Sequence, residues 1–230
     1  MSSDKNSNAI VIGLSGVTNG GKTSMSEALK RKFDADVINM DDYFWEDDSP
    51  NHIRLAEFNG HANWDCVESI DFETMHRDIL KWLDKVTVQK TLEQNETNMA
   101  AENDVTIKTG SDVKMLVIEG ILIFNYKPLS ELFAKKYFFT LTKEECTARR
   151  DKRSYEPPDP EGYFDGCVWP MHLKYKQELE GDNSIVYLNG TDDRNKLFER
   201  VCNDIGELSN GKWMTKQGIC QIKLLAVLGN

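Results

Sequence analysis

The chain contains the run Gly16-Val17-Thr18-Asn19-Gly20-Gly21-Lys22-Thr23, which matches the pattern G-x-x-x-x-G-K-S/T of a phosphate-binding loop. An apolar segment, 9–14, precedes this run, and a segment with helical character follows it from Ser24. The motif needs this strand–loop–helix context, because backbone N–H groups and the helix N-terminus then surround an anion. The sequence therefore predicts a nucleoside triphosphate site, in which Lys22 reaches the outer phosphates and Thr23 holds Mg²⁺. The alternative is a glycine-rich turn that binds no ligand.

Length and composition limit the classes of protein that the chain can represent. Its 230 residues suffice for one α/β domain with a small lid or insertion. The formal net charge of −10 argues against a nucleic-acid-binding surface. The five cysteines are scattered and form no C-x-x-C pair, so neither a disulfide framework nor a metal site built from them is expected. A polar N-terminus and the lack of a long apolar stretch predict a cytoplasmic protein without a membrane partner.

Short apolar runs alternate with helical patterns along most of the chain. The apolar runs predict strands at 9–14, 36–40, 113–118, 136–141 and 184–188. Helices are predicted at 23–33, 67–83, 143–153, 170–180 and 193–208. This alternation is typical of βαβ units, and so of an α/β fold with a central parallel sheet, helices on both faces and a small lid.

The chain is expected to consist of one domain with two flanking segments. We expect a flexible N-terminus at 1–8, a phosphate-loop domain at 9–205 with its lid at about 143–166, and a tail at 206–230. The polar segment 84–112 is expected to be a surface insertion or disordered, without a catalytic role. The tail contains an apolar run, and the sequence leaves open whether that run docks on the domain or contacts a protein partner.

Carboxylates follow two of the predicted strands. Asp41 and Asp42 end the second strand, and Glu119 ends the third. Ligands of an open parallel sheet bind beyond the carboxyl ends of its strands, which is also the edge that carries the phosphate loop. Phosphoryl transfer needs a metal ion, charge neutralisation and a group that orients the attacking hydroxyl. Asp41 and Glu119 are therefore predicted to have such roles, whereas turn capping explains Asp42 equally well.

A basic cluster, Arg149-Arg150-Asp151-Lys152-Arg153, stands out in this acidic chain. Arginines bind phosphate oxygens bidentately and stabilise the group that is transferred. A solvated helix face is the ordinary explanation of a basic run. Beside a phosphate loop, we favour a lid that closes over the phosphates.

Aromatic side chains next to polar groups indicate a site for a flat ring. Trp64 and Asp65 lie between the second strand and the next helix, and Tyr155 follows the basic cluster. Two aromatic rings can enclose a ring between them while Asp65 accepts hydrogen bonds from sugar hydroxyls. Taken alone, Trp64 is equally well explained as a core residue.

Several segments together resemble the nicotinamide riboside kinase family. They are the phosphate loop, Met40-Asp41-Asp42-Tyr43-Phe44, Val117-Ile118-Glu119-Gly120, Phe124-Asn125-Tyr126-Lys127-Pro128-Leu129 and Gly162-Tyr163-Phe164-Asp165-Gly166. The match covers about 9–205 and preserves the order and spacing of the segments. It departs from the family pattern at Cys167, where His is expected, at Asn189, where Asp is usual, and at Trp64, where Tyr is common.

The resemblance implies a kinase related to uridine and pantothenate kinases, which transfers the γ-phosphate of ATP to the 5′-hydroxyl of nicotinamide riboside. It implies Asp41 as the general base and Thr23, Asp41 and Glu119 as partners of Mg²⁺. On the ATP side it implies the phosphate loop with Ser24, Arg149, Arg153, Asp192 and Arg194. On the nucleoside side it implies Asp41, Asp42, Tyr43, Phe44, Trp64, Asp65, Arg150, Tyr155 and Glu156.

Two other functions are compatible with parts of the sequence. One is a pyrimidine nucleoside kinase of the same superfamily. The other is an adaptor protein that keeps the nucleotide-binding fold without catalysis and docks through its tail. The intact set Lys22, Thr23, Asp41 and Glu119 counts against an adaptor as the only function. The sequence does not distinguish ATP from GTP as the donor.

Overall fold

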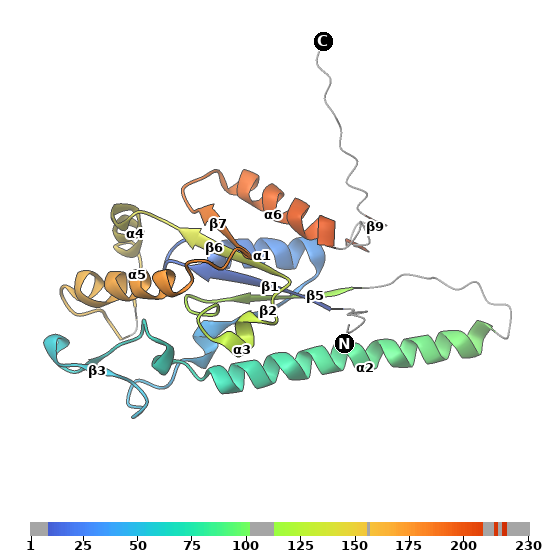
Figure 1. Ribbon diagram of the computed structural model, residues 1–230, viewed down its shortest axis with the longest axis horizontal. Coiled ribbons are helices and arrows are strands. Elements are labelled where there is room, and N and C mark those ends of the chain that lie inside the picture. The colour runs from blue at the N-terminus through green and yellow to red at the C-terminus, as the bar shows by residue number, and fades with distance from the viewer. Residues whose placement is uncertain (1–8, 102–112, 156, 209–213, 216–217, 220–230) are drawn as a thin grey trace, which may run out of the picture.

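A sheet of five parallel strands lies at the centre of the molecule in the computed structural model, which describes residues 9–101, 113–155, 157–208, 214–215 and 218–219 (Figure 1). Its strand order is β2-β5-β1-β6-β7. The strands are β1 (Ala9–Gly16), β2 (Asp36–Asn39), β5 (Lys114–Glu119), β6 (Lys135–Thr140) and β7 (Ile185–Asn189). All four pairings are parallel. The predicted α/β fold and its five strands are therefore confirmed.

Alternating side chains of the central strands supply a separate core on each face of the sheet. On one face, Ile12 and Leu14 of β1 pack with α1 (Lys22–Phe33) and α6 (Arg194–Leu208). On the other face, Val11 of β1 packs with α2 (Phe72–Ala101), α3 (Lys127–Ser130) and α5 (Trp169–Glu178). Figure 1 shows α1 and α6 on one side of the sheet and α2 and α3 on the other. The continuous apolar runs in the sequence reflect burial on both faces.

The predicted helix 67–83 differs from the structure at both ends. Its first residues form a short 3₁₀ turn, Val67–Ser69, and α2 begins only at Phe72, after Asp71 accepts a hydrogen bond from Thr74 N (2.9 Å). The helix then continues to Ala101, where an insertion without helical pattern was expected. The stretch 84–101 has no Gly or Pro and many good helix formers, so it extends the helix past the sheet without needing an apolar stripe.

Smaller differences from the sequence prediction lie outside the sheet. The helix α4 (Lys143–Arg150) ends before the last two basic residues of the cluster, which follow in a turn. Its start is a capping box between Thr142 and Glu145. Two short hairpins were not predicted: β3 (Arg54–Leu55) with β4 (His61–Ala62), and β8 (Met214–Thr215) with β9 (Gly218–Ile219). The predicted flexible N-terminus and most of the predicted tail lie outside the described residues.

No helix in the described part of the chain is both long enough and apolar enough to span a bilayer.

The phosphate loop leaves β1 in close contact with the neighbouring strand β6. Gly16 has a φ of +116°, and a Cβ at this position would overlap the backbone of Phe139. Val17 N donates to Phe139 O at 3.0 Å directly after it. Only glycine fits both the backbone angle and the space.

We expect Gly16→Ala to lower the free energy of unfolding by about 3 kcal/mol, because steric overlap adds to the cost of a positive φ. Gly21→Ala is the matched control: its φ is also positive, +107°, but a Cβ there meets nothing within 4 Å. The free energy of unfolding of the control should fall by only about 1 kcal/mol. Urea unfolding of both variants measures the difference, and equal losses would contradict the close contact with β6.

Candidate active site

A pocket of about 1210 Å³ opens where β1, β2 and β5 end. Its wall combines the phosphate loop, the ends of β2 and β5, the 3₁₀ turn η1 (Met40–Tyr43), the segment around Trp64, the basic cluster and the start of α6. These segments are far apart in the sequence. The parallel sheet brings them together because every strand delivers its following loop to the same edge.

The phosphate loop is shaped to surround an anion. Gly21 adopts a left-handed conformation as the N-cap of α1, and Asn19 is left-handed too, with a φ of 60°. The Lys22 side chain is 9% exposed, and its Nζ donates to Gly16 O (3.2 Å) and Val17 O (2.9 Å). Burial lowers the pKa of Lys22 to about 8, although Asp41 and Glu119 oppose the shift. A bound phosphate would favour the charged form of this lysine and raise its pKa again.

Two acids lie beside this lysine, each held by its own element. Asn39 accepts a hydrogen bond from Asp41 N (3.0 Å), which starts the turn η1 and leaves the Asp41 carboxylate open to the pocket. Glu119 is 4% exposed and accepts a hydrogen bond from Ser26 Oγ at 3.1 Å. Desolvation in the concave wall raises the pKa of both carboxyl groups, and Lys22 lowers both.

The donor set around these acids fits Mg²⁺ better than a metal held by protein alone. Within the described residues, no three His, Cys, Asp or Glu side chains are placed to hold an ion together. The Thr23 hydroxyl hydrogen-bonds the buried Glu119 carboxylate, and Asp41 faces the same pocket. Mg²⁺ typically binds one or two carboxylates and takes its remaining ligands from phosphates and water. The residues present therefore fit an ion that binds together with a nucleotide.

The two arginines of α4 have different partners. Arg149 donates to the backbone oxygens of Asn19 (3.0 Å) and Gly190 (2.8 Å), so it ties the phosphate loop to the loop after β7. Arg150 pairs with Asp159 (2.6 Å), and its guanidinium lies 4.0 Å from the centre of the Tyr155 ring. Both arginines line the pocket. Tertiary contacts thus fix the direction of each side chain.

Another part of the pocket wall is aromatic and acidic. The Trp64 ring packs edge-on against Phe44, with centroids 5.5 Å apart, and lies 4.4 Å from His52. Asp65 is beside it, and the Tyr163 hydroxyl oxygen lies 3.5 Å from Asp65 Oδ2. Burial raises the pKa of Asp65 to about 6, while the nearby Arg150 opposes the shift. This wall presents a flat apolar surface next to a strong hydrogen-bond acceptor.

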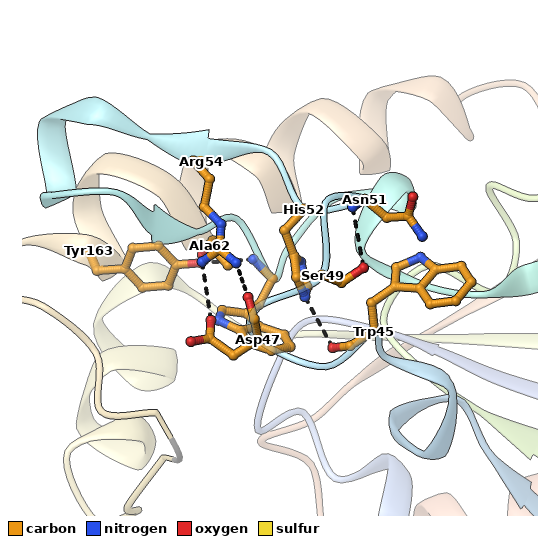
Figure 2. A network of polar contacts seen from close by, with 9 residues as sticks. Trp45, Asp47, Ser49, Asn51, His52, Arg54, Ala62 and Tyr163 are labelled. Atoms are coloured by element: carbon orange, nitrogen blue, oxygen red, sulfur yellow. Dashed lines mark hydrogen bonds and ion pairs between the residues drawn. The ribbon is translucent and has the colours of Figure 1, made fainter.

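The segment before this wall is held by its own polar contacts (Figure 2). His52 Nε2 lies 3.1 Å from Trp45 O, and the Arg54 guanidinium bonds both the side chain and the backbone oxygen of Asp47. Figure 2 also shows Tyr163 reaching the backbone of Ala62, where its hydroxyl donates at 3.2 Å. These contacts fix the loop that carries Trp64 and Asp65.

The structure brings most of the predicted site residues to the pocket. Its wall includes Thr18, Asn19, Gly20, Gly21, Lys22, Thr23, Ser24, Asp41, Phe44, Trp64, Asp65, Glu119, Arg149, Arg150, Arg153, Tyr155 and Arg194. Five predicted residues are not part of that wall: Gly16, Val17, Asp42, Tyr43 and Asp192. Tyr43 instead hydrogen-bonds Asp78 of α2 (3.5 Å), because its ring packs into the core under η1. Glu156 lies outside the described residues.

Four residues that were given no role in the sequence analysis support the site. Tyr163 and Asp159 contact Asp65 and Arg150, as described above. Asn63 is buried, and its Oδ1 accepts from Asp65 N (3.0 Å) and from Cys167 Sγ (3.3 Å). The contacts of Tyr163 and Cys167 join segments far apart in the chain, so no sequence spacing signals their roles. Cys167 therefore acts here as a buried donor that fixes Asn63.

Asn189, the other departure from the family pattern, shapes the loop that Arg149 contacts. Its Oδ1 accepts from Thr191 N (3.1 Å) and Thr191 Oγ1 (2.8 Å), closing a turn around Gly190. A side-chain oxygen is needed for this turn, and Asn provides it as Asp does.

The parallel sheet, the phosphate loop and the arginine-bearing segment after β6 define a P-loop nucleotide-binding protein.

A scan against models of protein families finds no match. The chain is 39% identical over 198 residues to nicotinamide riboside kinase 2 of Homo sapiens, covering 85% of this chain and 80% of the relative. It is 39% identical over 197 residues to nicotinamide riboside kinase 1 of Rattus norvegicus, covering 85% and 93%. A more distant relative is nicotinamide riboside kinase of Saccharomyces cerevisiae, 22% identical over 222 residues, covering 87% and 88%. The chain belongs to the nicotinamide riboside kinase family.

We expect the charged form of Asp65 to lower the free energy of unfolding at neutral pH. Between about pH 4 and about pH 6 the unfolded chain releases this proton while the folded protein keeps it, so stability falls as the pH rises. Asp65→Asn cannot ionise and should gain on the order of 1 to 2 kcal/mol relative to wild type between about pH 4 and about pH 7. Urea unfolding of wild type and Asp65→Asn at about pH 4 and about pH 7 measures this difference in the free energy of unfolding. Asp48→Asn, at an exposed position, is the control, and the same trend in both variants would contradict the effect of burial.

Proposed function

We propose that this protein transfers the γ-phosphate of ATP to the 5′-hydroxyl of nicotinamide riboside, giving nicotinamide mononucleotide. One observation carries the proposal: a single pocket contains both the phosphate loop and the wall formed by Trp64 and Asp65. A donor phosphate and a nucleoside can therefore meet inside it. The relatives named above support nicotinamide riboside as the acceptor.

On the donor side, the chain supplies charge and orientation. The N–H groups of the loop and the N-terminus of α1 bind the phosphates, and Lys22 leaves its backbone partners to neutralise the outer ones. Thr23 and Asp41, with Glu119 behind them, would hold Mg²⁺, which would supply positive charge against the phosphates. Arg153 lines the pocket, and we expect it to contact the transferring group, while Arg149 fixes the loop around Gly190.

On the acceptor side, Asp41 prepares the nucleophile. Its carboxylate accepts the proton of the 5′-hydroxyl as the oxygen bonds to the γ-phosphorus, while the bond from that phosphorus to the β,γ-bridging oxygen breaks and ADP leaves. The raised pKa of Asp41 makes it a better base than an exposed carboxylate, since general bases work best when their pKa is near the working pH. Asp65 accepts hydrogen bonds from the ribose hydroxyls, and Trp64 and Tyr155 offer their faces to the pyridinium ring.

The acidic and aromatic wall would favour a nucleoside whose base carries a positive charge. Nicotinamide riboside carries a positive charge on its ring, which aromatic faces and nearby carboxylates stabilise. Uridine is neutral and gains none of this attraction. We therefore expect the acidic and aromatic wall to favour nicotinamide riboside over a pyrimidine nucleoside.

We expect Asp41→Ala to reduce turnover by about 10²- to 10⁴-fold, the usual contribution of a general base. Binding of a non-hydrolysable ATP analogue should persist, because the phosphate loop is intact. A coupled assay of ADP release measures turnover, and Asp48→Ala, an exposed acid outside the pocket, serves as the control. Activity of Asp41→Ala close to that of wild type would exclude Asp41 as the base.

The identity of the acceptor is tested by competition. With ATP and Mg²⁺, nicotinamide riboside and uridine are supplied at equal concentration, and the two monophosphates are quantified by mass spectrometry. We expect nicotinamide mononucleotide to dominate by at least about tenfold, since desolvated cation–π contacts contribute on the order of 2 kcal/mol. Equal or greater formation of uridine monophosphate would overturn the proposed acceptor.

A further inference from the structure

Asn19 connects the two halves of the pocket through both its backbone and its side chain. Its backbone oxygen accepts from Arg149 Nη1 at 3.0 Å, on the side of the loop after β7. Its side-chain Nδ2 donates to the Tyr155 hydroxyl at 3.2 Å, on the nucleoside side. The same residue therefore belongs to the phosphate loop and contacts the aromatic residue that faces the acceptor.

The conformation of Asn19 leaves this side chain few alternatives. Its φ of 60° places it in the left-handed region, which asparagine tolerates better than other side chains. The remaining polar atom, Oδ1, is buried and has no hydrogen-bond partner among the described residues. The contact with Tyr155 is thus the hydrogen bond that orients this amide.

Tyr155 is in turn held from its other side. The Arg150 guanidinium lies 4.0 Å from the ring centre, and Asp159 Oδ2 accepts from Arg150 Nε (2.9 Å) and Nη2 (2.6 Å). The ring is therefore positioned by one contact from the lid and one from the phosphate loop. A nucleotide whose phosphates order the loop would therefore also order the hydrogen bond from Asn19 to Tyr155.

We propose that Asn19 is a positioning residue that couples the two substrates, so that a nucleotide in the phosphate loop increases the affinity for the nucleoside. This inference rests on the proposed function and adds to it a positive cooperativity between nucleotide binding and nucleoside binding. A ligand that orders the loop fixes the Asn19 amide, and the amide holds Tyr155 over the acceptor. The nucleoside then binds with a smaller loss of conformational entropy, because Tyr155 is already ordered. By linkage, the nucleoside increases the affinity for the nucleotide by the same factor.

The test is a coupling factor measured by isothermal titration calorimetry. The affinity for nicotinamide riboside is determined without nucleotide and with a saturating β,γ-imido analogue of ATP plus Mg²⁺. In wild type we expect the analogue to tighten nucleoside binding by on the order of 3- to 10-fold, the factor that one hydrogen bond contributes. Asn19→Gly keeps the left-handed backbone and deletes the amide, so its coupling factor should fall to about 1.

Tyr155→Phe removes the partner hydroxyl, keeps the ring, and lies outside the phosphate loop. Its coupling factor should also fall to about 1, and the double variant should match either single variant, because both changes delete the same bond. Asn59→Gly is the matched control: Asn59 has a φ of 54° and lies outside the pocket wall, so this variant should keep the wild-type factor.

The outcomes distinguish this inference from the proposed function. Nicotinamide riboside that binds wild type equally well with and without the analogue would overturn the coupling alone. A wild-type factor that survives in Asn19→Gly, or additive effects of the two changes, would also overturn it. Wild type that binds no nicotinamide riboside in either condition would overturn both.

Discussion

The close contact between the phosphate loop and the backbone of β6 is the constraint on which the rest of the site depends. Gly16 turns away from β1 at a positive φ with no room for a side chain, and Val17 N then bonds Phe139 O. This contact sets where the loop curls and where α1 begins. Lys22, Thr23 and Asn19 take their positions from it, and the acids at the ends of β2 and β5 face the same space because the sheet is parallel.

The acceptor side of the pocket depends on a different principle, contact between distant segments. Asn63 and Tyr163 fix the loop of Trp64 and Asp65, and Cys167 fixes Asn63. The hydrogen bonds of Asn63, Tyr163 and Cys167 favour one arrangement of this loop over its alternatives, although Trp64 Nε1 and His52 Nδ1 beside them are buried without a hydrogen-bond partner in the described part of the chain. Burial also disfavours the charged form of Asp65 and so raises its pKa. A site that binds a cation gains from such a carboxylate and loses some stability when the cation is absent.

The sheet and most of the helices were predictable because local patterns reflect burial. Strands buried on both faces read as continuous apolar runs, and the glycines of the loop mark a turn that other residues resist. The helix α2 was predicted too short because the sequence of its last turns carries no apolar stripe, although it contains good helix formers and no Gly or Pro. The start of α2 was predicted too early because residues 67–71 form a 3₁₀ turn and a cap instead. Such choices depend on neighbours that a local pattern does not contain.

The sequence by itself determined that the chain has a parallel α/β fold, a phosphate loop with its lysine, and acids at strand ends. Each of these follows from local spacing and from the chemistry of single residue types. Only the tertiary structure decided which side chains share the pocket: that Asp41 enters it while Tyr43 turns toward α2, that Arg149 holds two loops, and that Asn19 contacts Tyr155. The physical reason is that side-chain direction depends on packing between segments far apart in the chain, and sequence spacing does not record that packing.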